Sequence, residues 1–220
     1  MFIDIHCHNC IGNTQFAIKN LSHNFNNTTS YGYFSTGLHP WYLQENTWRN
    51  EFAILAKNAI NKSVVLIGEC GLDKSCKSNM ELQKEAFSAQ IILANKINKP
   101  LIVHCVKAYE EVHKTLEVNS NKVPIIFHGF NKKKELARWL INKGYYLSFG
   151  KSVFQPLKGA VLNYIPKERL FFETDDASIT IDNIYEQAAN ILGITLPELQ
   201  LQIKKNSIQL FAGTFIKDDY

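Results

Sequence analysis

The chain has 220 residues, of which 45% are hydrophobic and 20% are charged, and its net charge at pH 7 is +4. This composition is typical of a soluble globular protein, and a chain of this length can bury most of its apolar surface in one core. No apolar run approaches the roughly 18 residues of a membrane span, and the N-terminus enters a strand pattern without a basic leader segment. We therefore expect a cytoplasmic protein with no membrane association. The mild positive charge permits a phosphate-bearing substrate but does not by itself indicate one.

Short apolar runs bounded by turn residues predict buried strands along the whole chain. They cover residues 2–6, 15–21, 33–38, 64–68, 100–104, 124–128, 145–149 and 170–174. From the third run onward, the strands alternate with segments whose apolar residues have helical spacing. The predicted helices cover residues 47–61, 79–97, 107–119, 132–143, 182–192 and 196–211.

Strands that alternate with helices in this way predict a parallel sheet covered by helices. Eight such strands predict an α/β fold of the TIM-like (β/α)8 barrel type, formed by one domain over residues 1–220. The connection between the first two strands is too short for a helical crossover, and the next connection, residues 22–32, is polar and rich in turn residues. We therefore expect helices to be reduced around the first two strands.

Most of the predicted strands end in a side chain that can bind a metal ion. His6 and His8 lie two residues apart on the first strand, so their side chains share one face. The strand-end candidates for metal ligands are His6, His8, Glu69, His104, His128 and Asp175. The C-terminal strand ends of a parallel barrel lie on one rim, so these side chains are expected to converge there. Imidazole and carboxylate groups suit zinc, manganese or iron, and ligands from five strands favour two ions over one.

The five cysteines are odd in number and lack the spacing of a disulfide framework. Cys7, Cys70 and Cys105 each follow a candidate ligand directly, and on a strand the next side chain points to the opposite face. We therefore expect reduced, structural thiols that pack beneath the helices.

Several motifs occur together in a characteristic order. They are IDIHCH (3–8), GLHPW (37–41), IGECGLD (67–73), KPLIVHCVKA (99–108), IIFHGF (125–130), GYYLSFG (144–150) and ERLFFETD (168–175). In this combination, which spans nearly the whole chain, the sequence resembles the TatD family of metal-dependent deoxyribonucleases, which have amidohydrolase-like barrels. Independently of the resemblance, no lysine ends the fourth strand, so the carbamylated lysine of many two-metal amidohydrolases is excluded.

The resemblance implies a hydrolase that cleaves ester bonds, most often the phosphodiester bonds of DNA, with a metal-activated water. It implies two divalent ions per chain (Zn, Mn or Mg) and catalytic roles for Asp175 and Glu69, with Glu69 bridging the ions. The implied metal ligands are the six strand-end candidates given above.

Other side chains on the same motifs are open to two interpretations each. Lys107 could hold a phosphate oxygen, as the resemblance implies, or be a surface lysine on a first helical turn. His39 could contact substrate or stabilise the turn that follows it. Asp73 could orient a metal ligand or cap a loop. Trp41 and Tyr42 could stack on a base or pack against the protein.

The sequence departs from the family pattern in two loops. Asp176, Ala177 and Ser178 follow the ETD motif where the family usually has Ala-Pro. The family's HCFSG segment is HGFNK in this chain, which places Gly129 and Asn131 at positions that are usually small and polar. Both loops face the expected substrate, so the departures bear on substrate identity rather than on metal binding.

Two other functions remain open at the level of sequence. The first is a small-molecule metallohydrolase that acts on an amide, a lactone or a phosphoester, since the same ions polarise carbonyl and phosphoryl groups alike. The second is a catalytically inactive barrel that keeps its metal for stability and acts as a binding partner. The expected partner of the chain is DNA or another phosphoester substrate, with no obligate protein partner.

Overall fold

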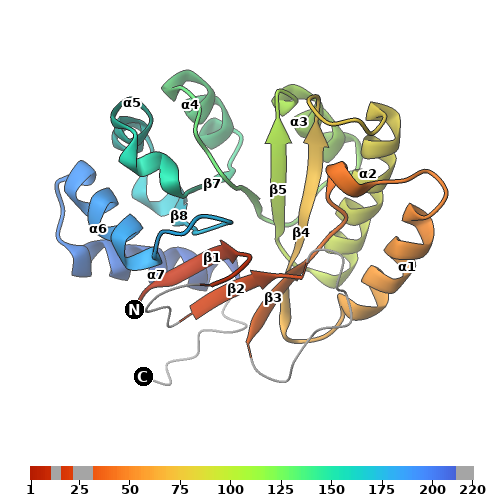
Figure 1. Cartoon of the computed structure of the whole chain (residues 1–220), viewed down its shortest axis with the longest axis horizontal. Helices are drawn as coiled ribbons and strands as arrows, with labels where there is room; N and C mark the ends of the chain where they lie inside the picture. Colours follow the sequence, from red (N-terminus) through yellow and green to blue (C-terminus); the bar gives the residue numbers. More distant parts are fainter. Residues whose placement is uncertain (11–15, 22–31, 212–220) are drawn as a thin grey trace. The chain divides into compact units, whose positions relative to one another are not determined.

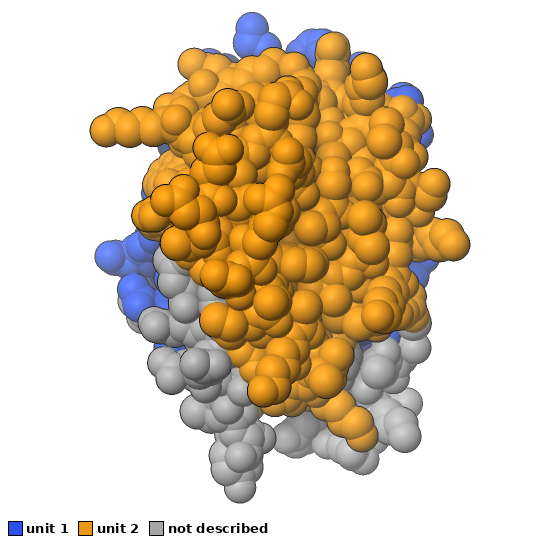
Figure 2. All heavy atoms as spheres, turned by 90° about the vertical axis from the view of Figure 1, so that its right-hand side faces the viewer, with its two compact units in different colours: residues 1–19, 126–220 blue, residues 20–125 orange. Residues whose placement is uncertain are grey.

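The computed structural model of the chain describes residues 1–10, 16–21 and 32–211. The chain divides into two compact units, which Figure 2 distinguishes by colour. Unit 1 comprises residues 1–19 and 126–220, and unit 2 comprises residues 20–125. The predicted single domain over residues 1–220 stays a prediction.

Unit 1 contains β1 (Ile3–Cys7), most of β2 (Phe16–Asn20) and β6 (Ile125–Phe127), and all of β7 (Tyr146–Phe149) and β8 (Leu170–Phe172). The pairs β1–β2, β6–β7 and β7–β8 are parallel. A parallel bridge between Cys7 and Asp175 places the end of β1 beside the segment that follows β8. The first and last strands of the chain are therefore neighbours.

Unit 2 contains β3 (Tyr33–Thr36), β4 (Val64–Asp73) and β5 (Leu101–Val106), again in parallel pairs. Figure 1 shows β4 and β5 side by side, with α2 (Met80–Ile97) running along them. Every residue of β4 is buried, which agrees with the continuous apolar runs expected of a strand covered on both faces.

All six predicted helices are confirmed, with small differences at their ends. They are α1 (Trp48–Asn58), α2, α3 (Tyr109–Val118), α4 (Lys134–Asn142), α6 (Ile181–Leu192) and α7 (Leu196–Leu210). The sequence did not predict the short α5 (Pro156–Gly159) or the 3-10 helices η1 (Pro40–Tyr42), η2 (Lys151–Phe154), η3 (Ala160–Tyr164) and η4 (Lys167–Arg169). Of the helices in the described residues, none is long and apolar enough to cross a membrane.

The eight strands follow one another in the sheet in chain order, from β1 to β8. Together with the parallel pairing and the helices that follow the strands, this order gives the TIM-like α/β barrel fold predicted from the sequence. We also predicted fewer helices around the first two strands. That prediction applies to residues 11–15 and 22–31, which lie outside the described residues, so it stays a prediction.

The predicted end of the fourth strand is wrong. The apolar run ends at residue 68, but β4 continues to Asp73, so Glu69 lies within the strand. Gly68 and Gly71 have φ values of +134° and +140°, and a Cβ on either would overlap a carbonyl oxygen of β5. The absence of side chains at these two positions lets β4 approach β5 closely beyond the point where its apolar pattern stops.

The expectation of five reduced cysteines is also wrong. Cys7 and Cys10 form a disulfide, while Cys70, Cys76 and Cys105 are free thiols. The turn after β1 gives Cys10 a φ of +35° and brings the two Cα atoms within 5.2 Å, which lies inside the usual range for a disulfide. A local pair of this kind depends on turn geometry, which arguments from framework spacing do not capture.

Tyr185 of α6 ties this helix to the strand that carries His6. Its buried hydroxyl donates a hydrogen bond to the Ile3 carbonyl oxygen (2.9 Å) and accepts one from the Ile3 amide (3.2 Å). Tyr185→Phe removes both bonds and leaves two buried backbone groups unsatisfied. We expect the free energy of unfolding, measured by urea denaturation, to fall by about 1–3 kcal/mol.

A matched control is Tyr164→Phe, because the Tyr164 side chain is 44% exposed. This variant should change the free energy of unfolding by less than about 0.5 kcal/mol. Equal stabilities for the two variants would contradict the anchoring role of Tyr185.

Candidate metal centre

The first cluster of ligand-type atoms lies in unit 1 and combines His6, His8 and Asp175. His6 lies in β1 and is fully buried, while His8 follows the strand directly. The Nε2 atoms of both histidines lie 3.5 Å from Asp175 Oδ1. The backbone fixes this contact, because the His8 amide donates to the Asp175 carbonyl and the Asp175 amide donates to the His6 carbonyl, both at 3.0 Å.

A second cluster in unit 1 adds His128 and Glu173 to Asp175. His128 directly follows β6, and its Nδ1 lies 3.4 Å from Glu173 Oε1. Glu173 directly follows β8 and is fully buried, and the Gly129 amide donates a 2.5 Å hydrogen bond to its Oε1. In each cluster of unit 1, the ligand-type atoms lie within 4.8 Å of one another.

Asp4 forms hydrogen bonds to the two segments that carry the unit 1 clusters. It accepts hydrogen bonds from the Thr174 amide (3.1 Å), the Thr174 hydroxyl (2.6 Å) and the His6 amide (3.3 Å). Burial raises the pKa of Asp4 to about 7, although the hydrogen bonds from Thr174 act in the opposite direction. Asp4 thus holds the segment between β8 and Asp175 against β1.

The third cluster lies in unit 2 and is centred on Glu69. Glu69 Oε1 lies 3.0 Å from His39 Nε2 and 3.0 Å from His104 Nδ1. The Asn20 side-chain amide donates a 3.4 Å hydrogen bond to the other carboxylate oxygen, Oε2. The three ligand-type residues, His39, Glu69 and His104, again lie within 4.8 Å of one another. His39 therefore contacts a predicted metal ligand, and its Nδ1 also accepts a hydrogen bond from the Trp41 amide.

Asp73 lies on the opposite side of the His104 ring. Its Oδ2 lies 3.0 Å from His104 Nε2 and accepts a 2.6 Å hydrogen bond from the Trp41 indole. Burial raises the pKa of Asp73, but hydrogen bonds from His104, Trp41 and the Ser75 amide outweigh this effect and lower the pKa below its ordinary value. Asp73 is thus placed to orient the His104 ring. This position agrees with the first interpretation from sequence, in which Asp73 orients a metal ligand.

Lys107, a predicted phosphate contact, follows β5 with an exposed side chain and a φ of +55°. Trp41, predicted to stack on a base or to pack, is 58% exposed as a residue, while its indole NH donates a hydrogen bond to Asp73.

Sequence reasoning assigned no role to three side chains that shape these clusters. Glu173 lies two residues before Asp175 in the ETD motif, so strand periodicity already placed it on the same face. Gln83 accepts a 2.7 Å hydrogen bond from the Asp73 amide and donates one to its carbonyl. For Gln83 and Asn20, no local sequence signal indicated a role.

The predicted ligands thus fall into one group within each unit. His6, His8, His128 and Asp175 come together in unit 1, while Glu69 and His104 come together in unit 2 with His39 and Asp73. Each group combines imidazole nitrogens with carboxylate oxygens, and this donor set fits divalent transition metals.

Comparison with known proteins agrees with this chemistry. A family model described as TatD-related DNase matches residues 4–212. YabD of Bacillus subtilis, named an uncharacterized metal-dependent hydrolase, is 33% identical over 197 residues, which cover 81% of this chain and 77% of that protein. TatD of Pantoea ananatis, a 3'-5' ssDNA/RNA exonuclease by name, is 30% identical over 205 residues, covering 82% of this chain and 78% of that protein.

Solved structures share the fold. The crystal structure of YjjV, a TatD homologue from Escherichia coli, has a TM-score of 0.79 at 18% identity and covers 96% of this chain and 98% of that chain. The family match extends over all the ligand clusters, from β1 to the segment after β8. The chain therefore belongs to the TatD family and is a metal-dependent hydrolase.

Proposed function

We propose that this chain hydrolyses phosphodiester bonds in single-stranded nucleic acid, with DNA as the principal substrate. The observation that carries the proposal is the contact of His6 and His8 with the Asp175 carboxylate at the end of β1. The similarity to TatD of Pantoea ananatis, named as a 3'-5' exonuclease of single-stranded DNA and RNA, supports this substrate class. A cytoplasmic location and the absence of an obligate protein partner stay predictions.

We propose that the six predicted ligands would hold two divalent ions (Zn, Mn or Mg), the number that the sequence resemblance implies. Family membership supports this assignment, as do the donor types of the clusters. When bound, such ions lower the pKa of a coordinated water and stabilise negative charge on a phosphoryl group. The proposed ligands are His6, His8, Glu69, His104, His128 and Asp175.

The remaining steps depend on the side chains themselves. Asp175 is one-third exposed, so its carboxylate can accept a proton from the water that attacks phosphorus. Asp73 keeps the His104 ring in place, since it contacts the ring nitrogen that faces away from Glu69. His39 and Lys107 contact the substrate in this proposal, with the Lys107 ammonium pairing with a phosphate oxygen.

Removing a ligand carboxylate should abolish most of the activity. Glu69→Gln and Asp175→Asn are each expected to lower kcat/KM for single-stranded DNA by more than about 100-fold, because even residues that only support a metal ligand contribute about 10–100-fold. The measurement is the Mn²⁺-dependent degradation of a labelled oligonucleotide. Glu117→Gln, which changes a carboxylate that is 65% exposed on α3, is the control and should retain wild-type activity. A folded Glu69 variant with full metal-dependent activity would contradict the proposal.

The role of Asp73 predicts a separate effect on metal affinity. Asp73→Ala should weaken binding of Mn²⁺ or Zn²⁺ by about 10–100-fold, since His104 loses the carboxylate that orients it. Trp41→Phe removes only one hydrogen bond to Asp73, so its effect should be smaller. Titration of the metal-free protein against a competing chelator measures both variants. Unchanged affinity in Asp73→Ala would show that Asp73 only supports its loop.

A substrate panel separates the proposed nuclease from the small-molecule alternative. Single-stranded DNA, RNA, a simple phosphodiester, a lactone and an amide should be compared at equal metal concentration. We expect the highest kcat/KM for single-stranded nucleic acid. A clear preference for the lactone or the amide would instead establish the alternative.

A further inference from the structure

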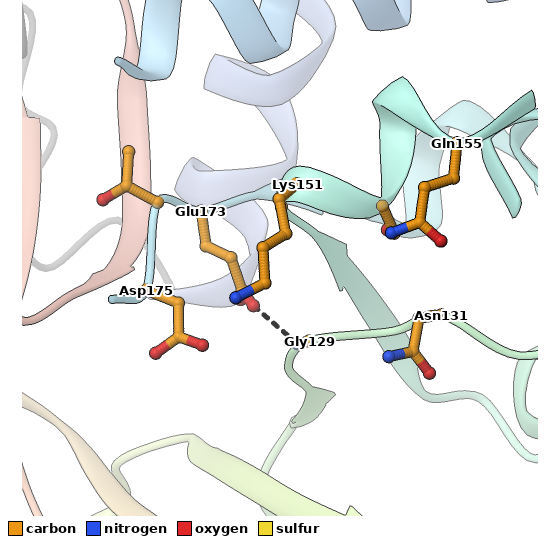
Figure 3. Close-up of a pocket in the computed structure, with 9 residues that line it drawn as sticks. Gly129, Asn131, Lys151, Gln155, Glu173 and Asp175 are labelled. Atoms are coloured by element: carbon orange, nitrogen blue, oxygen red, sulfur yellow. Dashed lines mark hydrogen bonds between the residues drawn. The ribbon is translucent and has the colours of Figure 1, made fainter. Parts of the chain in front are cut away.

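A cavity of about 140 Å³ lies in unit 1 next to Asp175 (Figure 3). Its walls come from the segments that follow three strands. Gly129 and Asn131 follow β6, Lys151 and Gln155 follow β7, and Glu173 follows β8.

Glu173 gives the cavity a buried hydrogen-bond acceptor. Its Oε1 accepts the hydrogen bond from the Gly129 amide, whereas its Oε2 is buried and has no hydrogen-bond partner within the described residues. An acceptor left unsatisfied in this way costs free energy, which a donor group on a ligand can recover. The cavity thus favours a ligand that carries an N–H or O–H group.

Two amides lie at other positions around the cavity. In Figure 3, the side chains of Lys151 and Glu173 extend toward Gly129, and those of Asn131 and Gln155 lie across from them. Within the described part of the chain, neither amide side chain makes a hydrogen bond. Each amide has both a donor and an acceptor, so the two can pair with adjacent polar atoms of a planar ligand.

The charges around the cavity limit what can enter it. Glu173 and Asp175 are carboxylates, so a free phosphate group would meet like charge at the cavity floor. Lys151 is the one lysine that lines the cavity, and its side chain is 62% exposed with Nζ 3.3 Å from Asp176 Oδ1. A neutral group inside the cavity, joined to a phosphate near the Lys151 ammonium, fits this arrangement best.

We propose that this cavity binds the nucleobase of the terminal nucleotide, next to the phosphodiester bond that is cleaved. The inference rests on the proposed function, because it identifies which part of a nucleic acid occupies the space beside Asp175. Nucleobases are neutral and have donors and acceptors side by side on one edge, a pattern that Asn and Gln amides recognise. Each standard base has an N–H group on its pairing edge, which can donate to Glu173 Oε2. Enzymes that act on nucleic acids commonly hold an unstacked base in a polar pocket of this kind.

The test compares oligonucleotides that differ only in the terminal base. The first ends in thymidine, the second in N3-methylthymidine, which lacks the N–H donor, and the third in an abasic residue. Each modification is placed at the 3' end in one oligonucleotide and at the 5' end in another. For the wild-type protein, we expect kcat/KM and the binding affinity from fluorescence anisotropy to be roughly 10-fold higher for thymidine than for N3-methylthymidine, at one end of the strand. Equal values for all three substrates at both ends would overturn the proposal.

Two sets of variants assign the effect to the cavity. Asn131→Ala and Gln155→Ala should each reduce the preference for a base over an abasic end, whereas Gln209→Ala, an exposed amide on α7, should keep it. Glu173→Gln replaces the acceptor with an amide and should bring the ratio of kcat/KM for thymidine and N3-methylthymidine ends close to one. Loss of bound metal in Glu173→Gln would mean that the open oxygen is a metal ligand, and it would overturn the assignment of the cavity floor.

A simple phosphodiester without a base, bis(p-nitrophenyl) phosphate, separates the two proposals. Metal-dependent hydrolysis of this compound and of the oligonucleotides, with no effect of the terminal base, overturns the cavity inference alone. Failure to hydrolyse any phosphodiester overturns the proposed function and the cavity inference with it.

Discussion

The pair of backbone hydrogen bonds between β1 and the segment after β8 is the constraint on which the unit 1 site depends. The His8 amide donates to Asp175 and the Asp175 amide donates to His6, both at 3.0 Å. These bonds join the end of the first strand to the segment after the last strand. The same backbone contact therefore makes these strands neighbours and brings His6, His8 and Asp175 together. Asp4 strengthens the connection through its two hydrogen bonds from Thr174. A carboxylate, rather than an apolar side chain, is buried at this depth because the backbone and hydroxyl donors of Thr174 would otherwise lack an acceptor.

In unit 2 a different constraint produces a similar result. The glycines of β4 let the strand approach β5 so closely that a side chain would collide with its carbonyl oxygens. Glu69 is thereby held against His104, while Asp73, four residues further along the same strand, contacts the other ring nitrogen. The imidazole is fixed between two carboxylates, which sets its orientation without any contribution from flexible loops. Ligands on strands are positioned more rigidly than ligands on loops, as a metal centre requires.

In the two proposals, metal chemistry and substrate recognition belong to different parts of the fold. The ligand-type side chains lie in strands or within three residues of a strand end, where backbone pairing limits their movement. The cavity next to Asp175 is instead formed by the loops after β6, β7 and β8, which can change without disturbing the sheet. Glu173 belongs to both parts, since it lines the cavity while its Oε1 holds the Gly129 loop, and its Oε2 is buried without a hydrogen-bond partner within the described residues.

The sequence by itself determined the positions of the strands and helices, because both follow from the periodicity of apolar side chains. It also determined the ligand-type residues His6, His8, His104 and Asp175, since each lies at or near the end of an apolar run. Only the tertiary structure decided where β4 ends, because that depends on the close approach of Gly68 and Gly71 to β5. The Cys7–Cys10 disulfide, the contact of Asp73 with His104 and the open oxygen of Glu173 likewise appear only in the folded chain. Each depends on distances between groups whose separation is set by turns and strand register, and local sequence patterns do not encode such distances.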